Sequence, residues 1–406
     1  MNDNELNIFL QSLLQPLSRS VEPSADTSIK QLFECRLLEV GLSQYQIEKL
    51  LNIERKSLEG ILDRTAKRVD IVNALKLSSF LNLNPEKFIN IYLTEMSPES
   101  IGELERARKL NFIASNFDLK NLYKAKFIDS KTDFDKIECR IKSFFGIENI
   151  FQYNDQKLYP LFSRTKRSSN NKMRDFWVRS AYSHFQKINN KNEFDRAALV
   201  SLLPKIRQYT MDTEKGLFVV AQALYNIGIT IIYQPYLPTV QVRGATFFVN
   251  NKPCIVLTDL QKNYPTIWFA LIHEIHHILY DLEIIQTNAY HLSGELDLFL
   301  IGEDEANDFS REYLFSEEKS KYIAPFINNE LIVREFAKKS QVHPSLIYSF
   351  YNYDRNNQGY HNAWSKYKQY FPDIKKTIER FNTNPWEKET IQESVDMIKE
   401  AVFNII

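Results

Sequence analysis

Cysteine is scarce in this sequence, which contains only three among 406 residues. Cys35, Cys139 and Cys254 are odd in number and lie roughly a hundred residues apart. Such spacing fits neither a disulfide framework nor a Cys-x-x-Cys metal site. We therefore expect reduced, buried thiols, as in proteins of the cytosol.

Excess charge of either sign is also missing. Lysine and arginine together number 51, as do aspartate and glutamate, so the formal net charge is zero. No bulk attraction draws the whole chain toward nucleic acid or an anionic membrane. Any binding to DNA must therefore come from a local basic patch.

We expect neither a targeting segment nor a membrane-spanning segment in this sequence. Its first residues, Met1 to Glu5, have no basic region of the kind that begins a signal peptide. The most apolar stretch, residues 217–233, is interrupted by Gln222 and Asn226. We expect a soluble, cytoplasmic protein without a membrane partner.

The sequence is rich in helical periodicity. With 44% apolar and 13% aromatic residues, the chain can form two or three domains, each with a buried core. Strand-like runs of β-branched and aromatic residues are confined to residues 228–257. The predicted fold class is α+β and mostly helical.

Composition and apolar spacing divide the chain into five parts. They are a flexible N-terminal arm at 1–28, an all-helical domain at 29–95, a helical spacer at 96–175 with an exposed basic loop at 163–174, a mixed domain at 176–355, and a C-terminal helical extension at 356–406.

The mixed domain is predicted to contain a short three-stranded sheet. Residues 228–233, 245–249 and 254–257 are the strand-like runs, and the last two are joined by a hairpin connection at 250–253. A helix follows directly. The edge of the hairpin is where we expect an extended peptide to add as a further strand.

That helix carries the pattern HExxH at residues 273–277. At 100° per residue, His273 and His277 lie about 40° apart on the helix, Glu274 lies near 100°, and the apolar residues occupy the opposite face. Two imidazoles one turn apart beside a carboxylate are typical of a zinc site with its own general base. A chain with seven histidines produces the pattern by chance on the order of one time in a hundred, so the surrounding residues must support it.

A catalytic zinc ion needs a third protein ligand. The extended HExxHxxGxxH motif is excluded, because Glu283 stands where its third histidine would be and Tyr280 replaces its glycine. His291 is one alternative, although it lies in a polar segment where histidines are usually solvated.

Two acidic residues at the start of a later helix are the other candidates, Glu303 and Glu305. Glu303 is the better placed, since Ala306, Asn307 and Ser310 share its helix face and their small size permits a close approach to the HExxH helix. Asn307 would then support the ligand from one turn away. An acidic first turn also suits the helix dipole, which would explain both glutamates without a metal.

The strand hairpin, the helix segment at 269–277 and Glu303 followed by Ala306, Asn307 and Phe309 resemble the ImmA/IrrE family of bacterial zinc metallopeptidases. The resemblance covers about residues 200–355, including the segment His343-Pro344-Ser345-Leu346-Ile347. It implies a zincin-like domain that binds one Zn²⁺ per chain through His273, His277 and Glu303, with Glu274 as the general base.

Two departures from the family pattern involve the site or its surroundings. His276 stands where a small residue is usual, and Leu314-Phe315-Ser316 replaces the common apolar-Met-Pro ending. We expect His276 to pack beside the ligands, with a role as a fourth ligand as the alternative. His343 is a candidate donor to the substrate, or the first residue of a helix.

The all-helical domain contains two short predicted helices separated by a turn at Asn52-Ile53. The first begins after Ser43, a suitable N-cap, and the second covers residues 54–62. Their length and spacing suit a helix-turn-helix, and the stretch resembles the Xre family of DNA-binding domains.

The Xre resemblance implies specific contacts with a DNA operator. Gln44 would meet a phosphate, Arg55, Lys56 and Glu59 would enter the major groove, and Lys67 and Arg68 would hold backbone phosphates. The alternative is a protein-interaction module, because Gly60 lies inside the second helix, Arg64 replaces the usual turn glycine, and residues 36–70 hold seven basic against six acidic residues.

Together these features predict a DNA-binding regulator with zinc endopeptidase activity. By the family resemblance it would cleave a repressor-like or partner protein, or itself, in a stress, mobile-element or toxin-antitoxin switch. A homodimer is expected because helix-turn-helix proteins usually read two half-sites. The alternative is a repressor or antitoxin whose metallopeptidase fold acts as a non-catalytic sensor.

Overall fold

The computed structural model describes residues 28–66, 68–94, 98–155, 171–260, 262–288, 290–293, 303–359, 366–381 and 384–403. The chain divides into two compact units, residues 1–110 and 111–406. The expected N-terminal arm lies outside the described residues except for Ser28, which caps the first described helix.

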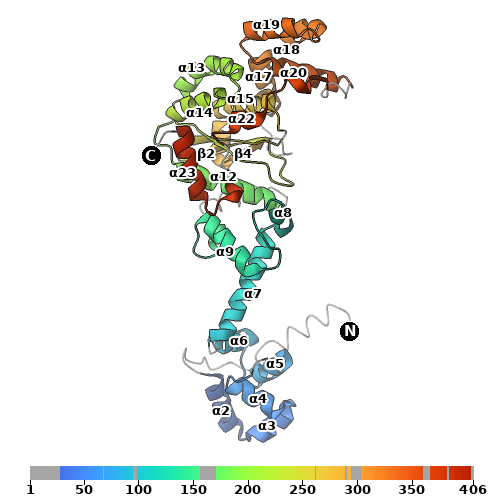
Figure 1. Ribbon diagram of the computed structural model, residues 1–406. Coiled ribbons are helices and arrows are strands. Elements are labelled where there is room, and N and C mark those ends of the chain that lie inside the picture. Colours follow the sequence, from blue (N-terminus) through green and yellow to red (C-terminus); the bar gives the residue numbers. More distant parts are fainter. Residues whose placement is uncertain are drawn as a thin grey trace. The chain divides into compact units, whose positions relative to one another are not determined.

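The first unit consists of helices in its described part (Figure 1). They are α2 (Ile29–Val40), α3 (Gln44–Leu51), α4 (Arg55–Leu62), α5 (Ile71–Phe80), α6 (Pro85–Thr94) and the first part of α7 (Pro98–Asn116). Ser28 and Ser43 each form a capping box at a helix start, as serine at an N-cap should. Phe33, Leu58 and Leu77 lie at the centre of the core and are almost fully buried.

Residues with positive φ end two short helices of this unit, α2 and α3. Gly41 (φ 64°) follows α2 and Asn52 (φ 49°) follows α3, and both adopt the left-handed conformation that terminates helices. Arg64 also has a positive φ of 62°, where a glycine would be unstrained. Gly60 inside α4 is explained by packing, because a Cβ there would lie 3.1 Å from the Cβ of Ala66.

The second unit contains a mixed four-stranded sheet in the order β1-β3-β2-β4. The strands are β1 (Thr230–Tyr233), β2 (Gly244–Val249), β3 (Lys252–Leu257) and β4 (Tyr290–Ser293). β1 runs parallel to β3, whereas β2 is antiparallel to both β3 and β4.

The sheet confirms the α+β class but corrects two expectations. It has four strands rather than three, because the polar segment around His291 pairs with β2 as β4. The β2–β3 hairpin therefore has a neighbour on each side and offers no free edge for a substrate. β4 is an edge strand of the described sheet instead.

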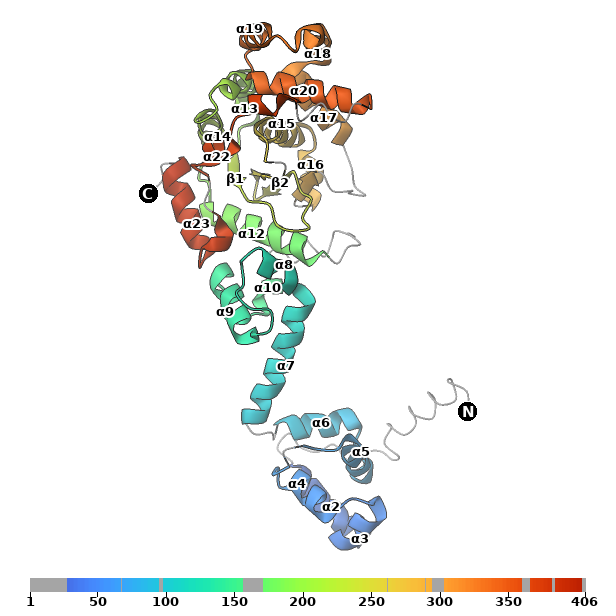
Figure 2. The ribbon, with the colours of Figure 1, turned by 45° about the vertical axis from the view of Figure 1, so that its right-hand side comes forward.

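Helices cover both faces of this sheet (Figures 1 and 2). α12 (Lys172–Ile188) lies on one face, where the ring of Tyr182 packs against that of Phe247 on β2. α15 (Tyr264–Tyr280) lies on the other face, against β2 and β3. Because side chains alternate along a strand, Thr246 points toward α15 while Phe247 points toward α12.

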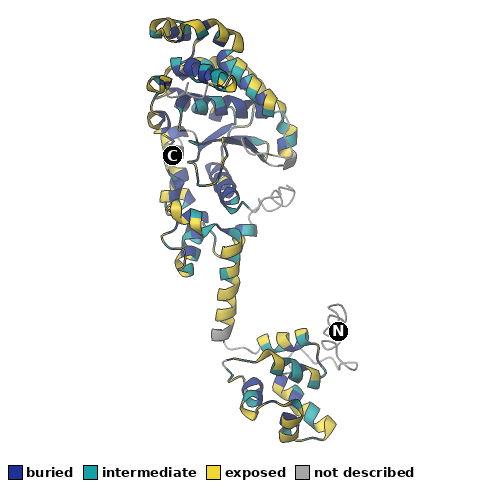
Figure 3. Ribbon diagram, turned by 90° about the vertical axis from the view of Figure 1, so that its right-hand side faces the viewer, coloured by how far each residue is buried: buried dark blue, intermediate teal, exposed yellow. Residues whose placement is uncertain are grey.

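The remaining helices surround this centre. They are α8 (Leu119–Lys124), α9 (Phe134–Phe145), α10 (Gln152–Asp155), α13 (Arg196–Ile206), α14 (Gly216–Asn226), α16 (Leu282–Asn288), α17 (Glu303–Phe315), α18 (Glu317–Ile323), α19 (Glu330–Ser340), α20 (Pro344–Asn357), α22 (Ile374–Ile378) and α23 (Ile391–Ile398). Short 3₁₀ turns occur at η1 (Arg207–Met211), η2 (Ala324–Phe326), η3 (Lys368–Tyr370) and η4 (Pro385–Glu387), and a π-helical turn forms η5 (Lys399–Phe403). Figure 3 shows buried residues concentrated along the sheet and α15.

The expected boundaries of the mixed domain differ from those of the compact unit. Ile113 of α7, Phe144 of α9 and Val395 of α23 belong to the same hydrophobic core as the sheet. Arg140 of α9 also donates hydrogen bonds to the carbonyl oxygens of Glu389 (2.8 Å) and Trp386 (2.9 Å). The second half of the predicted spacer and the C-terminal extension are therefore parts of this unit.

The expected exposed loop at 163–174 needs correction at its end. Residues 163–170 lie outside the described part of the chain, but Lys172 and Arg174 belong to α12, and Arg174 is buried. The buried-thiol prediction holds for Cys254 alone, because Cys35 and Cys139 are exposed. Neither Cys35 nor Cys139 lies on the inward face of its helix.

Among the residues that the structure describes, no helix has both the length and the apolar composition needed to cross a membrane.

The packing of α23 on α12 leads to a prediction about acid stability. His184 of α12 is buried between the two helices, where its Nδ1 lies 2.9 Å from the Ser180 carbonyl oxygen and its Nε2 lies 3.1 Å from the Ser394 hydroxyl. Burial lowers the pKa of His184 from 6.5 to about 4. The unfolded chain therefore takes up a proton at a higher pH than the folded chain, and the free energy of unfolding falls as pH drops from 6.5 to about 4.

The expected loss of stability is on the order of 3 kcal/mol over that range. Denaturant unfolding at a series of pH values measures it. His184→Gln should be less stable at pH 7 but should have a shallower pH dependence between pH 6.5 and 4. Equal slopes for the two proteins would contradict the assignment to His184.

Candidate metal centre

α15 presents its functional residues on a helix that is buried along most of its length. Pro265 occupies the first turn, where its missing N–H costs nothing, and Leu271, Ile272 and Ile275 form a fully buried apolar face. The second element of the site is α17, which packs along α15. Ala306 and Ser310 are the fully buried small residues at this contact, as the sequence predicted.

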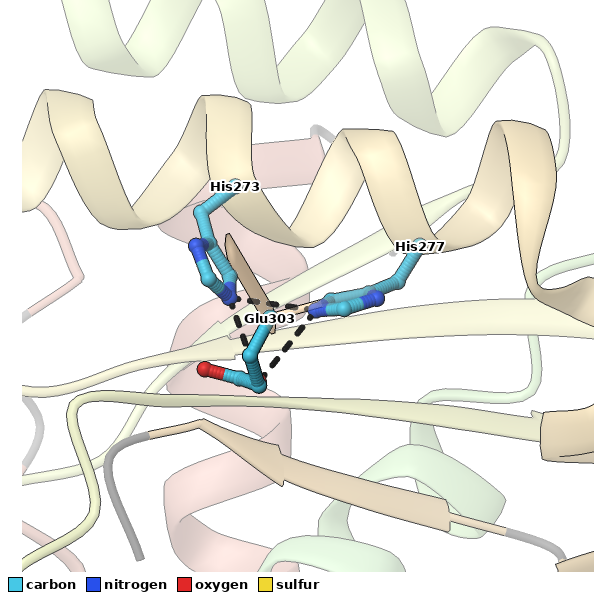
Figure 4. Close-up of side chains that lie close together, drawn as sticks. All are labelled: His273, His277 and Glu303. Atoms are coloured by element: carbon cyan, nitrogen blue, oxygen red, sulfur yellow. Dashed lines mark hydrogen bonds and ion pairs between the residues drawn. The ribbon is translucent and has the colours of Figure 1, made fainter. Parts of the chain in front are cut away.

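Three side chains from these two helices converge (Figure 4). The Nε2 atoms of His273 and His277 lie 3.1 Å apart, and Oε1 of Glu303 lies 3.5 Å from each of them. His273 and His277 are buried and Glu303 is mostly so. Together these residues could hold a metal ion. Two imidazole nitrogens that face each other and a carboxylate are a donor set that suits a divalent cation.

The other ring nitrogen of His277 is also engaged. Its Nδ1 lies 2.7 Å from Oδ2 of Asp281, the residue that follows α15. A carboxylate in this position accepts a hydrogen bond from the Nδ1–H group and so orients Nε2 toward the ligand cluster. His276, His277 and Asp281 form a second group that could hold a metal, but Nδ1 of His276 is farther from Asp281, at 3.8 Å. We therefore assign Asp281 to the orientation of His277.

A fourth residue reaches Glu303 from the sheet. Nε2 of His291 on β4 lies 2.6 Å from Glu303 Oε1, and its ring centroid lies 4.3 Å from that of His277. The sequence placed His291 in a loop and gave it only as an alternative ligand. Tyr290, His291, Leu292 and Ser293 alternate between apolar and polar residues, but a run of four is too short to predict a strand.

The charges of the cluster are strongly coupled. Burial alone would raise the pKa of Glu303, but hydrogen bonds with His273, His277 and His291 hold that pKa far below its usual range. Burial acts against protonation of His277, yet its hydrogen bonds with Glu303 and Asp281 and the nearby charge of Glu274 raise its pKa to about 9. Glu303 is therefore a carboxylate that the surrounding imidazoles hold in the ionised state.

Glu274 is fully buried between α15 and the sheet. Its Oε2 accepts a hydrogen bond of 2.6 Å from the Thr246 hydroxyl on β2. Its Oε1 has no hydrogen-bond partner among the described residues. Burial of a carboxylate oxygen without a hydrogen-bond partner costs free energy, and nearly all buried polar atoms in folded proteins have such a partner. The exception at Glu274 therefore points to a role for this oxygen.

The structure separates the two acidic candidates for third ligand. Glu303 joins the histidines, whereas Glu305 is exposed and lies outside the cluster. Asn307, expected to support the ligand, is partly buried, and within the described part of the chain its side chain makes no hydrogen bond to Glu303.

His276 and His343 occupy structural positions. The buried ring of His276 packs against Tyr280 and Phe309, and burial lowers its pKa. His343 is the N-cap of α20, where its Nδ1 accepts a hydrogen bond from the Ser345 backbone N–H at 3.2 Å. Its ring packs against Tyr264, about 13 Å along α15 from His273. The described contacts thus support the helix-start interpretation of His343.

The residues expected to contact DNA lie on and around α3 and α4. Arg55 and Lys56 are exposed on the first turn of α4, and Nε of Arg55 pairs with Oε1 of Glu59 at 2.7 Å. Gln44, at the start of α3, donates a hydrogen bond of 2.9 Å to Glu48. Arg68 is exposed, and Lys67 lies outside the described residues.

Comparison of this chain with protein-family models, with curated proteins and with solved structures gave no match.

The contact between Asp281 and His277 predicts a measurable effect on metal affinity. Asp281→Asn keeps the size of the side chain but removes the negative charge that accepts the Nδ1–H hydrogen bond of His277. We expect the affinity for zinc to fall by about 10-fold to 100-fold. Competition with a chromophoric chelator measures this, and an unchanged dissociation constant would show that Asp281 does not orient the ligand.

Proposed function

We propose that the second unit is a zinc-dependent endopeptidase. One observation carries the proposal: His273, His277 and Glu303 converge through three ligand atoms, and the unpartnered Oε1 of the general-base candidate Glu274 lies one residue along the same helix. Three protein ligands of the His₂Glu type leave a coordination position open, which is the arrangement of catalytic rather than structural zinc. The donor set therefore fits this ion.

When bound, zinc supplies a positive charge that polarises a carbonyl group and lowers the pKa of a water molecule to about 7. Glu274 is the residue that moves protons. Its Oε1 accepts a proton from the attacking water, whose oxygen forms a bond to the carbonyl carbon. Glu274 then delivers this proton to the amide nitrogen as the carbon–nitrogen bond breaks, so the carboxylate is regenerated and one peptide bond is hydrolysed.

The substrate in this proposal is an extended segment of a protein. β4 is an edge strand of the described sheet and carries His291, which contacts Glu303. A strand edge presents unpaired backbone N–H and C=O groups, to which an extended peptide can add. Flexible segments meet this requirement, whereas folded ones do not.

The cleavage of denatured proteins tests this activity without knowledge of the natural substrate. The zinc-loaded full chain is incubated with a denatured protein mixture, and new N-termini are identified by mass spectrometry. The same protein stripped by a chelator is the control. We expect new termini with a shared sequence pattern that vanish on zinc removal; termini that persist in the stripped protein would point to a contaminating protease.

We further propose that α3 and α4 bind DNA as a helix-turn-helix. The left-handed Asn52 between the two helices and the exposed Arg55 and Lys56 on α4 support this. The Arg55–Glu59 pair is exposed, so its loss costs little when Arg55 contacts a base or a phosphate. Glu59 lowers the positive charge of this face of α4. Binding should therefore depend more on specific contacts with bases and phosphates than on general electrostatic attraction to DNA.

A gel-shift titration over a range of salt concentrations tests DNA binding. A duplex taken from upstream of the encoding gene is the probe. The double variant Arg55→Ala with Lys56→Ala should bind more weakly, and its salt slope should be smaller by about one for each phosphate that the variant no longer neutralises. Lys136→Ala, at an exposed position on α9, is the control and should bind as the unaltered protein does. Equal binding by both variants would place the DNA contact outside Arg55 and Lys56, and no shift of the unaltered protein at low salt would favour a protein-interaction module.

Together the two activities describe a regulator that binds DNA and cleaves a repressor-like or partner protein, or itself. The second candidate is a sensor that binds metal without turnover. The complete burial of Glu274 favours it, because a general base must be reached by water. Product formation that depends on Glu274 separates the two candidates.

A further inference from the structure

β2 presents two residues to the helix that carries Glu274. Gly244 and Thr246 alternate along the strand and share the face that packs on α15. Both lie next to the Glu274 carboxylate. The Thr246 hydroxyl donates to Oε2 at 2.6 Å, and a Cβ placed on Gly244 would lie 2.4 Å from Oε1.

From this geometry we propose that Thr246 is a positioning residue for the general base. The inference rests on the proposed peptidase function. By holding Oε2, the Thr246 hydroxyl fixes the rotation of the carboxylate and leaves Oε1 as the oxygen that accepts the proton. Thr246 does not touch the reacting atoms; it acts through Glu274.

Burial makes the Thr246 contact necessary. Burying the charge of a carboxylate costs free energy unless hydrogen bonds replace its contacts with water. Glu274 and Thr246 are both fully buried. Among the described residues, Thr246 is the one hydrogen-bond donor to the Glu274 side chain. Without it, the carboxylate would turn toward another donor or toward the ligand cluster.

Gly244 leaves space for the second oxygen of the carboxylate. The carboxylate lies so close to the Gly244 α-carbon that no side chain fits between them. Gly244 therefore has a steric role here, independent of backbone conformation. The hydroxyl of Thr246 attracts one oxygen, and the bare α-carbon of Gly244 makes room for the other.

Replacing Thr246 by valine removes the hydroxyl while the β-branched shape stays nearly the same. A shift of about 1 Å in a catalytic group can cost on the order of 100-fold in rate. We expect Thr246→Val to lower kcat by about 10-fold to 100-fold, with KM and zinc content unchanged. Thr246→Ser keeps the donor and should restore kcat to within a few-fold of the unaltered protein.

Three measurements on the full-length variants test the inference: kcat and KM on a peptide from the cleavage screen, zinc content, and a crystal structure of Thr246→Val. The inference is supported if kcat alone falls, serine restores it, and the Glu274 carboxylate has turned in the crystal. It is overturned if Thr246→Val keeps full kcat, if serine fails to restore it, or if zinc content and the unfolding temperature fall together with kcat.

Glu274→Gln separates this inference from the proposed function. If Glu274→Gln keeps full activity, the proposed function fails and the role of Thr246 fails with it. If Glu274→Gln is inactive while Thr246→Val is fully active, the peptidase proposal stands and only the positioning role is overturned.

Discussion

Replacing Glu303 by glutamine is expected to lower the affinity of the protein for zinc by more than about 100-fold, a larger effect than the loss of a supporting residue produces. The Glu303 carboxylate lies 3.5 Å from the Nε2 atoms of both His273 and His277, and it is the negative charge shared by the two imidazoles. Glutamine has the same shape without that charge. A chelator competition titration measures the dissociation constant.

The chain offers a matched control two residues away. Glu305 belongs to the same helix turn but is exposed and outside the cluster. Glu305→Gln should therefore bind zinc as tightly as the unaltered protein. A normal affinity for Glu303→Gln would show that another residue is the third ligand, and His291, 2.6 Å from Glu303, would be the next candidate.

Replacing Glu274 by glutamine is expected to abolish turnover and preserve the metal. The general base contributes about 100-fold to 10,000-fold to proton transfer, and glutamine cannot accept the proton of water. The amide oxygen of glutamine can still accept the hydrogen bond from Thr246, so the local structure should survive. We expect kcat to fall by about 1,000-fold while zinc content stays the same. Single-turnover cleavage of an identified peptide and metal analysis give both quantities.

The control for this variant is Glu283→Gln, which changes an exposed carboxylate just after α15. It should leave kcat unchanged. Equal cleavage by the unaltered protein and Glu274→Gln would remove Glu274 from the mechanism. A zinc-bound protein that forms no product depending on Glu274 would instead identify the non-catalytic sensor.

Local periodicity predicted the parts of the site that lie on single helices. The HExxH spacing placed His273 and His277 on one face, and the pattern of small residues selected Glu303 over Glu305. Asp281 could have been found in the same way, since it lies four residues after His277, a spacing that brings helical neighbours together. These inferences need only the geometry of a helix.

Contacts that depend on strand pairing could not be predicted from the sequence. His291 lies opposite Thr246 because β4 pairs with β2 in a register that no local pattern specifies. β4 has only four residues, too few for its alternation to stand out from a polar loop. The same pairing placed the hairpin inside the sheet and made β4 an edge strand of the described sheet.

The boundaries of the second unit also depended on tertiary packing. The helices at 111–155 and the C-terminal segment have apolar faces that the sequence could show. The sequence does not show which neighbouring element covers each apolar face, because this depends on long-range contacts. One such contact joins Arg140 to the backbone of Trp386, almost 250 residues away in sequence.

Anomalous diffraction at the zinc absorption edge, from crystals of the zinc-loaded full chain, locates the bound ion directly. We predict one peak, bounded by Nε2 of His273, Nε2 of His277 and the Glu303 carboxylate. A peak between His276 and Asp281, or no peak near α15, would contradict it.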